Sequence, residues 1–68
     1  MITITVNGKP RDCPAGLELR DVLLHLGYQP DVVVVELNGK ITSRSQWAGR
    51  RVVESDSLEV VTIVGGGT

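Results

Sequence analysis

Hydrophobic and polar residues alternate one by one at the start of the chain. Residues 2–6 read ITITV, and this period of two predicts a strand with one apolar face. The dipeptide Asn7-Gly8 comes next. It is the preferred sequence for a type I′ hairpin turn because both residues tolerate positive φ. Residues 9–13 are therefore expected to return as a second strand, with Pro10 at its start or on a sheet edge, since proline has no N–H to donate.

The spacing of apolar residues lengthens in the next segment. Within residues 17–26, leucine or valine stands at positions 19, 22, 23 and 26, and steps of three and four are typical of a helix with one buried face. Gly27 is expected to cap the C-terminus of this helix. A hairpin followed by an amphipathic helix is thus predicted for the first half of the chain.

The second half of the chain predicts mainly strands. The segment DVVVVELNGK, residues 31–40, is expected to form a strand that ends in a second Asn-Gly turn. Residues 43–49 indicate a single helical turn around Trp47, capped by a serine. Further strands are expected at Val52-Val53 and over residues 58–64, with a turn at the intervening sequence ESDS.

This order of elements indicates an α+β fold with a mixed sheet. The helix would cross right-handedly over one face of the sheet and return the chain as a strand beside the first one. The arrangement is the β-grasp, or ubiquitin-like, fold, in which the N-terminal and final strands lie together in the centre of the sheet. We expect the β-grasp domain to cover residues 1–64, and residues 65–68 to form a flexible C-terminal glycine tail.

Composition narrows the chemistry that such a domain can perform. The chain has 68 residues, 41% of them hydrophobic and 22% charged, which predicts one globular domain with a thin core and no deep active-site cavity. One cysteine and one histidine are too few for an internal disulfide or a closed metal site. Cys13 is expected to be a small buried filler, and His25 a solvated helix residue.

Charge and hydropathy argue against nucleic-acid and membrane partners. The net charge is −1, and the seven Lys and Arg residues are scattered among few aromatic residues, whereas nucleic-acid binding usually needs a basic stripe with aromatic side chains. The longest uninterrupted apolar run is Val32–Val35, which is far too short to span a membrane. No signal peptide is visible at the N-terminus, so a cytoplasmic location is expected.

Alternation in the last predicted strand suggests a docking surface. One face of that strand would carry Leu58, Val60 and Thr62, and the other Glu59, Val61 and Ile63. A single helix can cover only one of these faces, so apolar side chains should remain on the open face, where Val32 and Val34 would add to them. Such an exposed apolar patch usually marks a partner site. The alternative is that the valines reflect strand propensity alone.

The chain closes with VVTIVGGGT, in which three glycines follow the last predicted strand. Glycine has no Cβ, so a glycine tail can lie extended in a channel too narrow for any side chain. Residues 64–67 would reach roughly 13 Å at about 3.3 Å per residue, which is enough to enter another protein's active site. A frayed end without function is the alternative.

From Leu37 onward, the sequence LNGKITSRSQWAGRRVVESDSLEVVTIVGGG resembles the ThiS family, the sulfur carrier proteins of thiamine biosynthesis. Members of that family show an Asn-centred turn, a basic residue shortly before a tryptophan, an acidic turn, and a last strand that runs into VGGG or a similar end. The stretch CPAGLELRDVLLHLG is similar to that family's loop and helix. The resemblance therefore covers essentially the whole chain.

The resemblance implies a carrier rather than an enzyme. An ATP-using enzyme of the ubiquitin-activating type would adenylate the terminal glycine carboxylate. Sulfur from a persulfide, supplied by a donor such as a cysteine desulfurase, would convert it to a thiocarboxylate, which then gives its sulfur to thiazole synthase. Gly67 would carry the reactive group, with Gly66 and Gly65 as the tail before it. The carrier itself would bind no cofactor, since the partner uses the ATP, and it would be a monomer when free.

Two residues depart from the family pattern. The family usually ends at the second glycine of its pair, whereas Thr68 follows Gly67 here, so adenylation requires that Thr68 be trimmed or be foreign to the native chain. Ser55 stands in ESDS where the family more often has glycine. We expect a local turn variant in which the φ of Ser55 stays negative.

Three other functions share parts of this pattern. The small subunit of molybdopterin synthase resembles this fold and also ends in two glycines, and a ubiquitin-like modifier would share the tail and explain removal of Thr68. A β-grasp module that binds RNA or protein without covalent chemistry would not need the glycines. Deletion of Gly66 and Gly67 would separate the covalent carriers from such a module.

Overall fold

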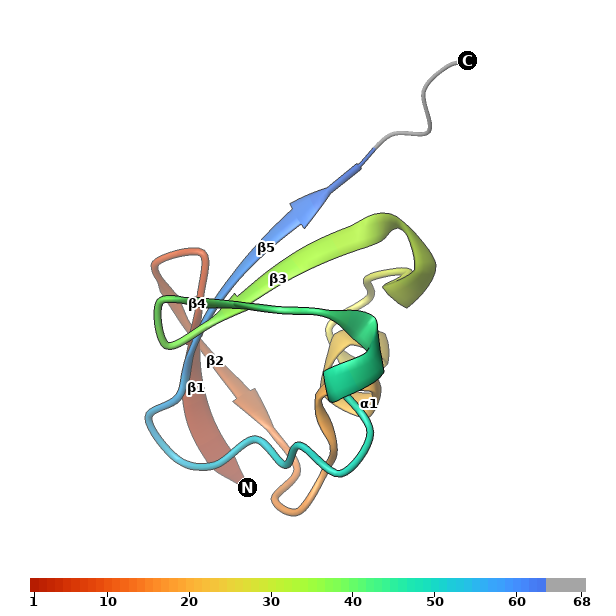
Figure 1. The fold of residues 1–68 in the computed structure, drawn as a ribbon. Coiled ribbons are helices and arrows are strands. Elements are labelled where there is room, and N and C mark those ends of the chain that lie inside the picture. Colours follow the sequence, from red (N-terminus) through yellow and green to blue (C-terminus); the bar gives the residue numbers. More distant parts are fainter. Residues whose placement is uncertain (64–68) are drawn as a thin grey trace.

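The computed structural model describes residues 1–63 as an α+β fold (Figure 1), and residues 64–68 lie outside the described part. In chain order the elements are β1 (Ile2–Val6), β2 (Lys9–Cys13), α1 (Leu19–His25), the 3₁₀ helix η1 (Pro30–Val32), β3 (Val33–Leu37), β4 (Lys40–Thr42), the 3₁₀ helix η2 (Arg44–Gln46) and β5 (Ser57–Thr62). The strands form one sheet in the order β2-β1-β5-β3-β4. Both the α+β class and the β-grasp topology are as expected from the sequence.

The position of β5 in the middle of the sheet sets the topology. It pairs in parallel with β1, as expected, and antiparallel with β3 along the whole length of β3. The expectation that the strand after the helix would lie beside β1 is therefore wrong. β2 pairs with one edge of β1, and β4 pairs with one edge of β3. The other edges of β1 and β3 are therefore free, and β5 lies between these two strands. The end of β5 consequently leaves from the rigid centre of the sheet (Figure 1).

Both Asn-Gly turns adopt the predicted geometry. Asn7 and Gly8 have φ values of 52° and 83°, and Asn38 and Gly39 have values of 53° and 85°, the two consecutive positive values that a type I′ turn requires. Each turn joins two antiparallel strands, β1 to β2 and β3 to β4. Pro10 lies on the edge strand β2, where its missing N–H leaves no ladder bond unmade.

The short strand lies at a different place from the predicted one. It is β4, directly after the second turn, whereas Val52-Val53 forms no strand. Val52 instead donates its N–H to the carbonyl of Leu17 at 3.0 Å, and its side chain is fully buried. The apolar character of Val52 thus comes from burial beside the start of the helix, and not from pairing in the sheet.

The helix α1 is shorter than predicted but ends as predicted. Gly27 has a φ of 93°, and its N–H reaches the carbonyl of Leu24 at 3.1 Å, while the N–H of Tyr28 reaches that of Leu23 at 2.9 Å. This pair of bonds is the Schellman motif, which satisfies carbonyls that the last turn leaves free. His25, the last residue of α1, is exposed as expected.

One apolar cluster fills the space between α1 and the sheet. Its buried members are Ile4, Val6, Cys13, Leu19, Val22, Leu23, Val33, Val35, Leu37, Trp47, Val52, Leu58 and Val60. The predicted role of Cys13 as a packing residue is confirmed, since its side chain is buried, and Trp47 is buried as well. The indole N–H of Trp47 donates to the carbonyl of Thr42 at 3.0 Å, which joins η2 to β4. Burial, and then the charge of Asp12, raise the pKa of the Cys13 thiol.

Candidate functional site

The open face of the sheet carries an apolar surface at the end where β5 leaves the fold. The expected alternation in β5 is present, because Leu58 and Val60 are buried whereas Val61 is 62% exposed. Beyond the strand, Ile63 is 51% exposed. Val34 of β3 lies directly opposite Val61 and is also exposed. The structure therefore brings these apolar side chains together on the side away from α1.

Val32 does not extend this surface as part of a strand. The predicted strand over residues 31–40 begins only at Val33, because Pro30 starts the 3₁₀ helix η1 and Val32 ends it. Val32 is half-buried, and its carbonyl accepts a hydrogen bond from the N–H of Ile63 at 2.6 Å. Val32 thus contributes a backbone hydrogen bond, which anchors Ile63 and extends the pairing of β5 by one residue beyond Thr62.

Ile41 belongs to the open face but was not predicted from the sequence. It is 72% exposed and lies on β4 opposite Glu36. The repeated sequence NGK could have predicted it. A returning strand is expected after the first Asn-Gly turn, and a second Asn-Gly turn directly precedes Lys40 and Ile41. A groove of about 210 Å³ separates β4 and η2 from the end of β5, with Val34, Ile41 and Ile63 among its lining residues and Trp47 beneath them.

Two asparagine side chains hold β5 in place, one from each hairpin turn. Asn7 accepts a hydrogen bond from the N–H of Val60 at 2.7 Å and donates to the carbonyl of the same residue at 3.1 Å. Asn38 accepts from the N–H of Ser57 at 2.9 Å and donates to the carboxylate of Asp56 at 3.0 Å. The turns therefore fix the start and the middle of the strand that leads to the C-terminus.

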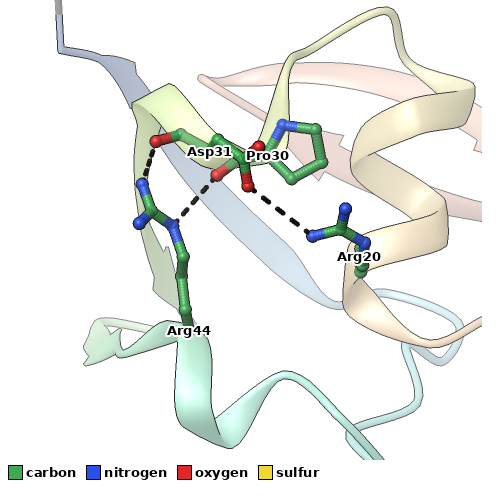
Figure 2. A network of polar contacts seen from close by, with 4 residues as sticks. All are labelled: Arg20, Pro30, Asp31 and Arg44. Carbon is green, nitrogen blue, oxygen red and sulfur yellow. Dashed lines mark hydrogen bonds and ion pairs between the residues drawn. The ribbon is translucent and has the colours of Figure 1, made fainter. Parts of the chain in front are cut away.

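The basic residue before Trp47 holds η1 and η2 together. Figure 2 shows Arg44 pointing at the backbone of η1, where Nε donates to the carbonyl of Pro30 at 3.2 Å and Nη2 donates to that of Asp31. The carboxylate of Asp31 in turn lies 3.9 Å from Arg20 of α1. Since Val32 follows directly in η1, this network supports the backbone segment on which Ile63 is anchored.

The acidic turn before β5 differs from expectation at Ser55. Its φ is 72°, so the expectation of a negative value is wrong. The N–H of Asp56 reaches the carbonyl of Val53 at 3.1 Å, and this four-residue turn with positive φ at its third position is of type II. The buried carboxylate of Asp56 accepts a hydrogen bond from the N–H of Val53 at 2.9 Å and thereby caps this turn.

Other kinds of site find no support in the described part of the chain. Among residues 1–63, no group of three or more His, Cys, Asp or Glu residues is placed to hold a metal ion. The same residues contain no helix with the length and apolar character needed to cross a bilayer. The predicted tail residues Gly65, Gly66 and Gly67, together with Thr68, lie outside the described residues.

A central strand that leads toward a glycine-rich C-terminal sequence, in a sheet with one open apolar face, defines a small ubiquitin-like β-grasp protein. The sequence profile of the ThiS family matches residues 4–67. The chain therefore belongs to the ThiS family of sulfur carrier proteins.

Known structures and sequences agree with this assignment. The crystal structure of the thiamine biosynthesis protein ThiS from Geobacter metallireducens superposes with a TM-score of 0.79 at 33% identity, covering 97% of this chain and 100% of that one. The uncharacterized protein ycf40 of Pyropia yezoensis is 36% identical over 66 residues, which are 97% of this chain and 93% of that protein.

Similarity also extends to part of a larger protein. The thiazole synthase of Magnetococcus marinus is 39% identical over 64 residues, which are 94% of this chain but only 20% of that protein. The thiazole synthase of Paramagnetospirillum magneticum shows the same coverage of 20% at 34% identity. The chain thus spans about a fifth of the length of these thiazole synthases, which contain a ThiS-like segment.

Proposed function

We propose that the chain carries sulfur as a C-terminal thiocarboxylate for thiazole formation in thiamine biosynthesis. The observation that supports this most directly is the continuity of the central strand β5, through Ile63, with the sequence VGGG. A rigid central strand gives the tail a fixed starting point, and glycines let the tail enter a narrow active site. Membership of the ThiS family supports the same chemistry.

The chemistry requires a leaving group on the terminal carboxylate, because a free carboxylate is a poor electrophile. Attack of the Gly67 carboxylate on ATP forms an acyl-adenylate and releases pyrophosphate. The terminal sulfur of a persulfide then attacks the acyl carbon and AMP leaves. Reduction of the resulting S–S bond by a thiol leaves the thiocarboxylate, which gives its sulfur to thiazole synthase. ATP is bound by the partner enzyme, and the carrier needs no cofactor of its own.

The carrier contributes the tail and a docking surface. We assign docking to the open face formed by Val34, Glu59, Val61 and Ile63, with Val32 as its backbone anchor. This face lies at the end of β5 from which the tail continues, so a partner that covers it also receives the tail. Exposed apolar side chains gathered on one face are typical of a protein interface.

Three partners follow from this chemistry. They are a ubiquitin-activating-type adenylating enzyme, a sulfur donor such as a cysteine desulfurase, and thiazole synthase. The last is supported by relatives in which a ThiS-like segment belongs to a thiazole synthase. We place the carrier in the cytoplasm as a free monomer, where ATP and thiols are available and a buried free thiol such as Cys13 persists.

Adenylation tests this function directly. Chains ending at Gly67 and at Thr68 are each incubated with the adenylating enzyme, ATP and labelled pyrophosphate, and label entering ATP is measured. Exchange with the chain that ends at Gly67, and none with the one that ends at Thr68, supports the proposal, because only the first has a free glycine carboxylate. Absence of exchange with both chains contradicts it.

A further inference from the structure

Two glutamates face each other on the open side of the sheet. Glu36 of β3 lies directly opposite Glu59 of β5 in the antiparallel register. Within residues 1–63, neither carboxylate has a lysine or arginine at ion-pair distance. Like charges directly opposite each other destabilise a sheet, so the isolated domain gains nothing from this pair.

Basic side chains on the strands lie on the other side of the sheet. Residues directly opposite each other in an antiparallel pair share a face. Lys9 is opposite Val6, Arg11 opposite Ile4 and Lys40 opposite Leu37, and these three partners are all buried toward α1. The remaining arginines lie on α1, on η2 and in the loop before Val52. The ionisable strand positions of the open face, Asp12, Glu36 and Glu59, are therefore all acidic.

Apolar residues flank the glutamate pair on two sides. Ile41 lies opposite Glu36 on β4, and the cross-strand pair Val34 and Val61 is the next one on the same face. A partner that covers these apolar side chains also removes water from the two carboxylates. Burying a charge without an opposite charge is costly, so the partner must bring a cation to this position.

We infer that the open face receives an apolar surface of the adenylating enzyme from which one basic side chain, best an arginine, projects between Glu36 and Glu59. A guanidinium offers several N–H donors in a planar fork and can bind two carboxylates at once. This inference rests on the proposed function and names the chemistry of its docking partner. A second copy of the chain is disfavoured as the occupant, because it would bring four carboxylates together.

Binding of the adenylating enzyme, measured by calorimetry without ATP, tests the inference. Glu36→Gln and Glu59→Gln keep the side-chain size and remove the charge, and each should weaken binding about tenfold. Asp21→Asn makes the same change in charge at an exposed position of α1 and should leave affinity unchanged. The double variant should also lose most of the salt dependence shown by the native chain.

Thermal unfolding separates binding from folding in these variants. The Gln variants should melt at or above the temperature of the native chain, because they relieve the repulsion between Glu36 and Glu59. Affinities equal to that of the native chain, or an equal loss in Asp21→Asn, would overturn the inference. If adenylation succeeds while the Gln variants bind normally, the inference alone fails. If binding depends on the two charges but no adenylation occurs, the proposed function alone fails.

Discussion

The side-chain amide of Asn7 is paired with the backbone of Val60 through two hydrogen bonds. The N–H of Val60 donates to Oδ1 at 2.7 Å, and Nδ2 donates to the carbonyl of Val60 at 3.1 Å. The backbone register between β1 and β5 covers only two residue pairs, so this side chain prolongs the ladder past the end of β1. The tip of the first hairpin therefore holds the middle of β5, the strand that leads toward the C-terminus.

Removal of the Asn7 amide should destabilise the domain. Glycine accepts the positive φ at this position, so Asn7→Gly removes only the side-chain hydrogen bonds, which are the two to Val60 and one of 3.4 Å to the hydroxyl of Tyr28. We expect about 1–3 kcal/mol less free energy of unfolding. Asn7→Ala should cost roughly 1 kcal/mol more, because alanine disfavours positive φ. Urea denaturation measures both. A glycine variant as stable as the native chain would show that the amide bonds do not matter.

Ser55 should be a site where glycine stabilises the fold. Its φ of 72° is uncommon for a residue with a Cβ, and relief of this conformation is worth about 1 kcal/mol. Ser55→Gly should therefore raise the free energy of unfolding. Ser45→Gly is the matched control, because Ser45 is exposed in η2 without positive φ, and it should lower stability instead. Equal effects at the two positions would refute the account of the turn.

The buried thiol of Cys13 predicts a loss of stability in alkali. Burial raises its pKa above the ordinary value of 9.0, so the folded state favours the neutral thiol. The neutral thiol's contribution to the free energy of unfolding is fully present below this ordinary pKa, and it is lost as the pH rises through the higher pKa of the folded chain. Denaturation at a series of pH values should show this decline in the native chain and a shallower one in Cys13→Ala. Identical pH profiles for the two chains would contradict the prediction.

Val61 offers a matched test of the open face. Val61 is 62% exposed on this face, and Val53 is 56% exposed in the turn before β5. Aspartate at position 61 should reduce kcat/KM for adenylation about tenfold or more, because it puts an unpaired charge into the interface, whereas Val53→Asp should leave it unchanged. Circular dichroism checks that both variants fold. Equal activities would place docking elsewhere on the molecule.

Reversal of charge at Glu59 tests the same face from its acidic side. Glu59→Lys would put a positive charge opposite Glu36, so the variant should fold at least as well as the native chain. Activation by the adenylating enzyme should nevertheless fall, since a lysine at position 59 would repel the basic side chain that we infer for the partner and would neutralise Glu36. Pyrophosphate exchange and thermal unfolding provide the two measurements. Retained exchange at native KM would remove Glu59 from the docking surface.

Local patterns predicted the elements whose cause is local. The dipeptide Asn7-Gly8 was enough to predict a hairpin turn, because both residues tolerate positive φ. Gly27, which follows the periodic leucines, was enough to predict the end of α1. The open face also followed from the alternation around Val61, because a single helix covers one side of a sheet.

Features that depend on distant contacts were missed. β4 has only three residues, Lys40–Thr42, which is too short to show a period. Val52-Val53 looks like a strand, but Val52 is buried beside Leu17 and Val53 is exposed. The pairing of β5 with β1 was predicted, whereas its pairing with β3 was not, because it joins strands that are distant in the sequence. The positive φ of Ser55 occurs together with a hydrogen bond from its N–H to the carbonyl of Thr3, a contact that no local pattern contains.

The intact mass of the protein isolated from its own cells tests the central claim most directly. It is measured before and after incubation with ATP, a sulfur source and the cell extract. The account predicts a species that ends at Gly67 and gains the mass difference between sulfur and oxygen, as a thiocarboxylate requires. Persistence of Thr68, with neither an adenylate nor a change in mass under any condition, would contradict the sulfur carrier function.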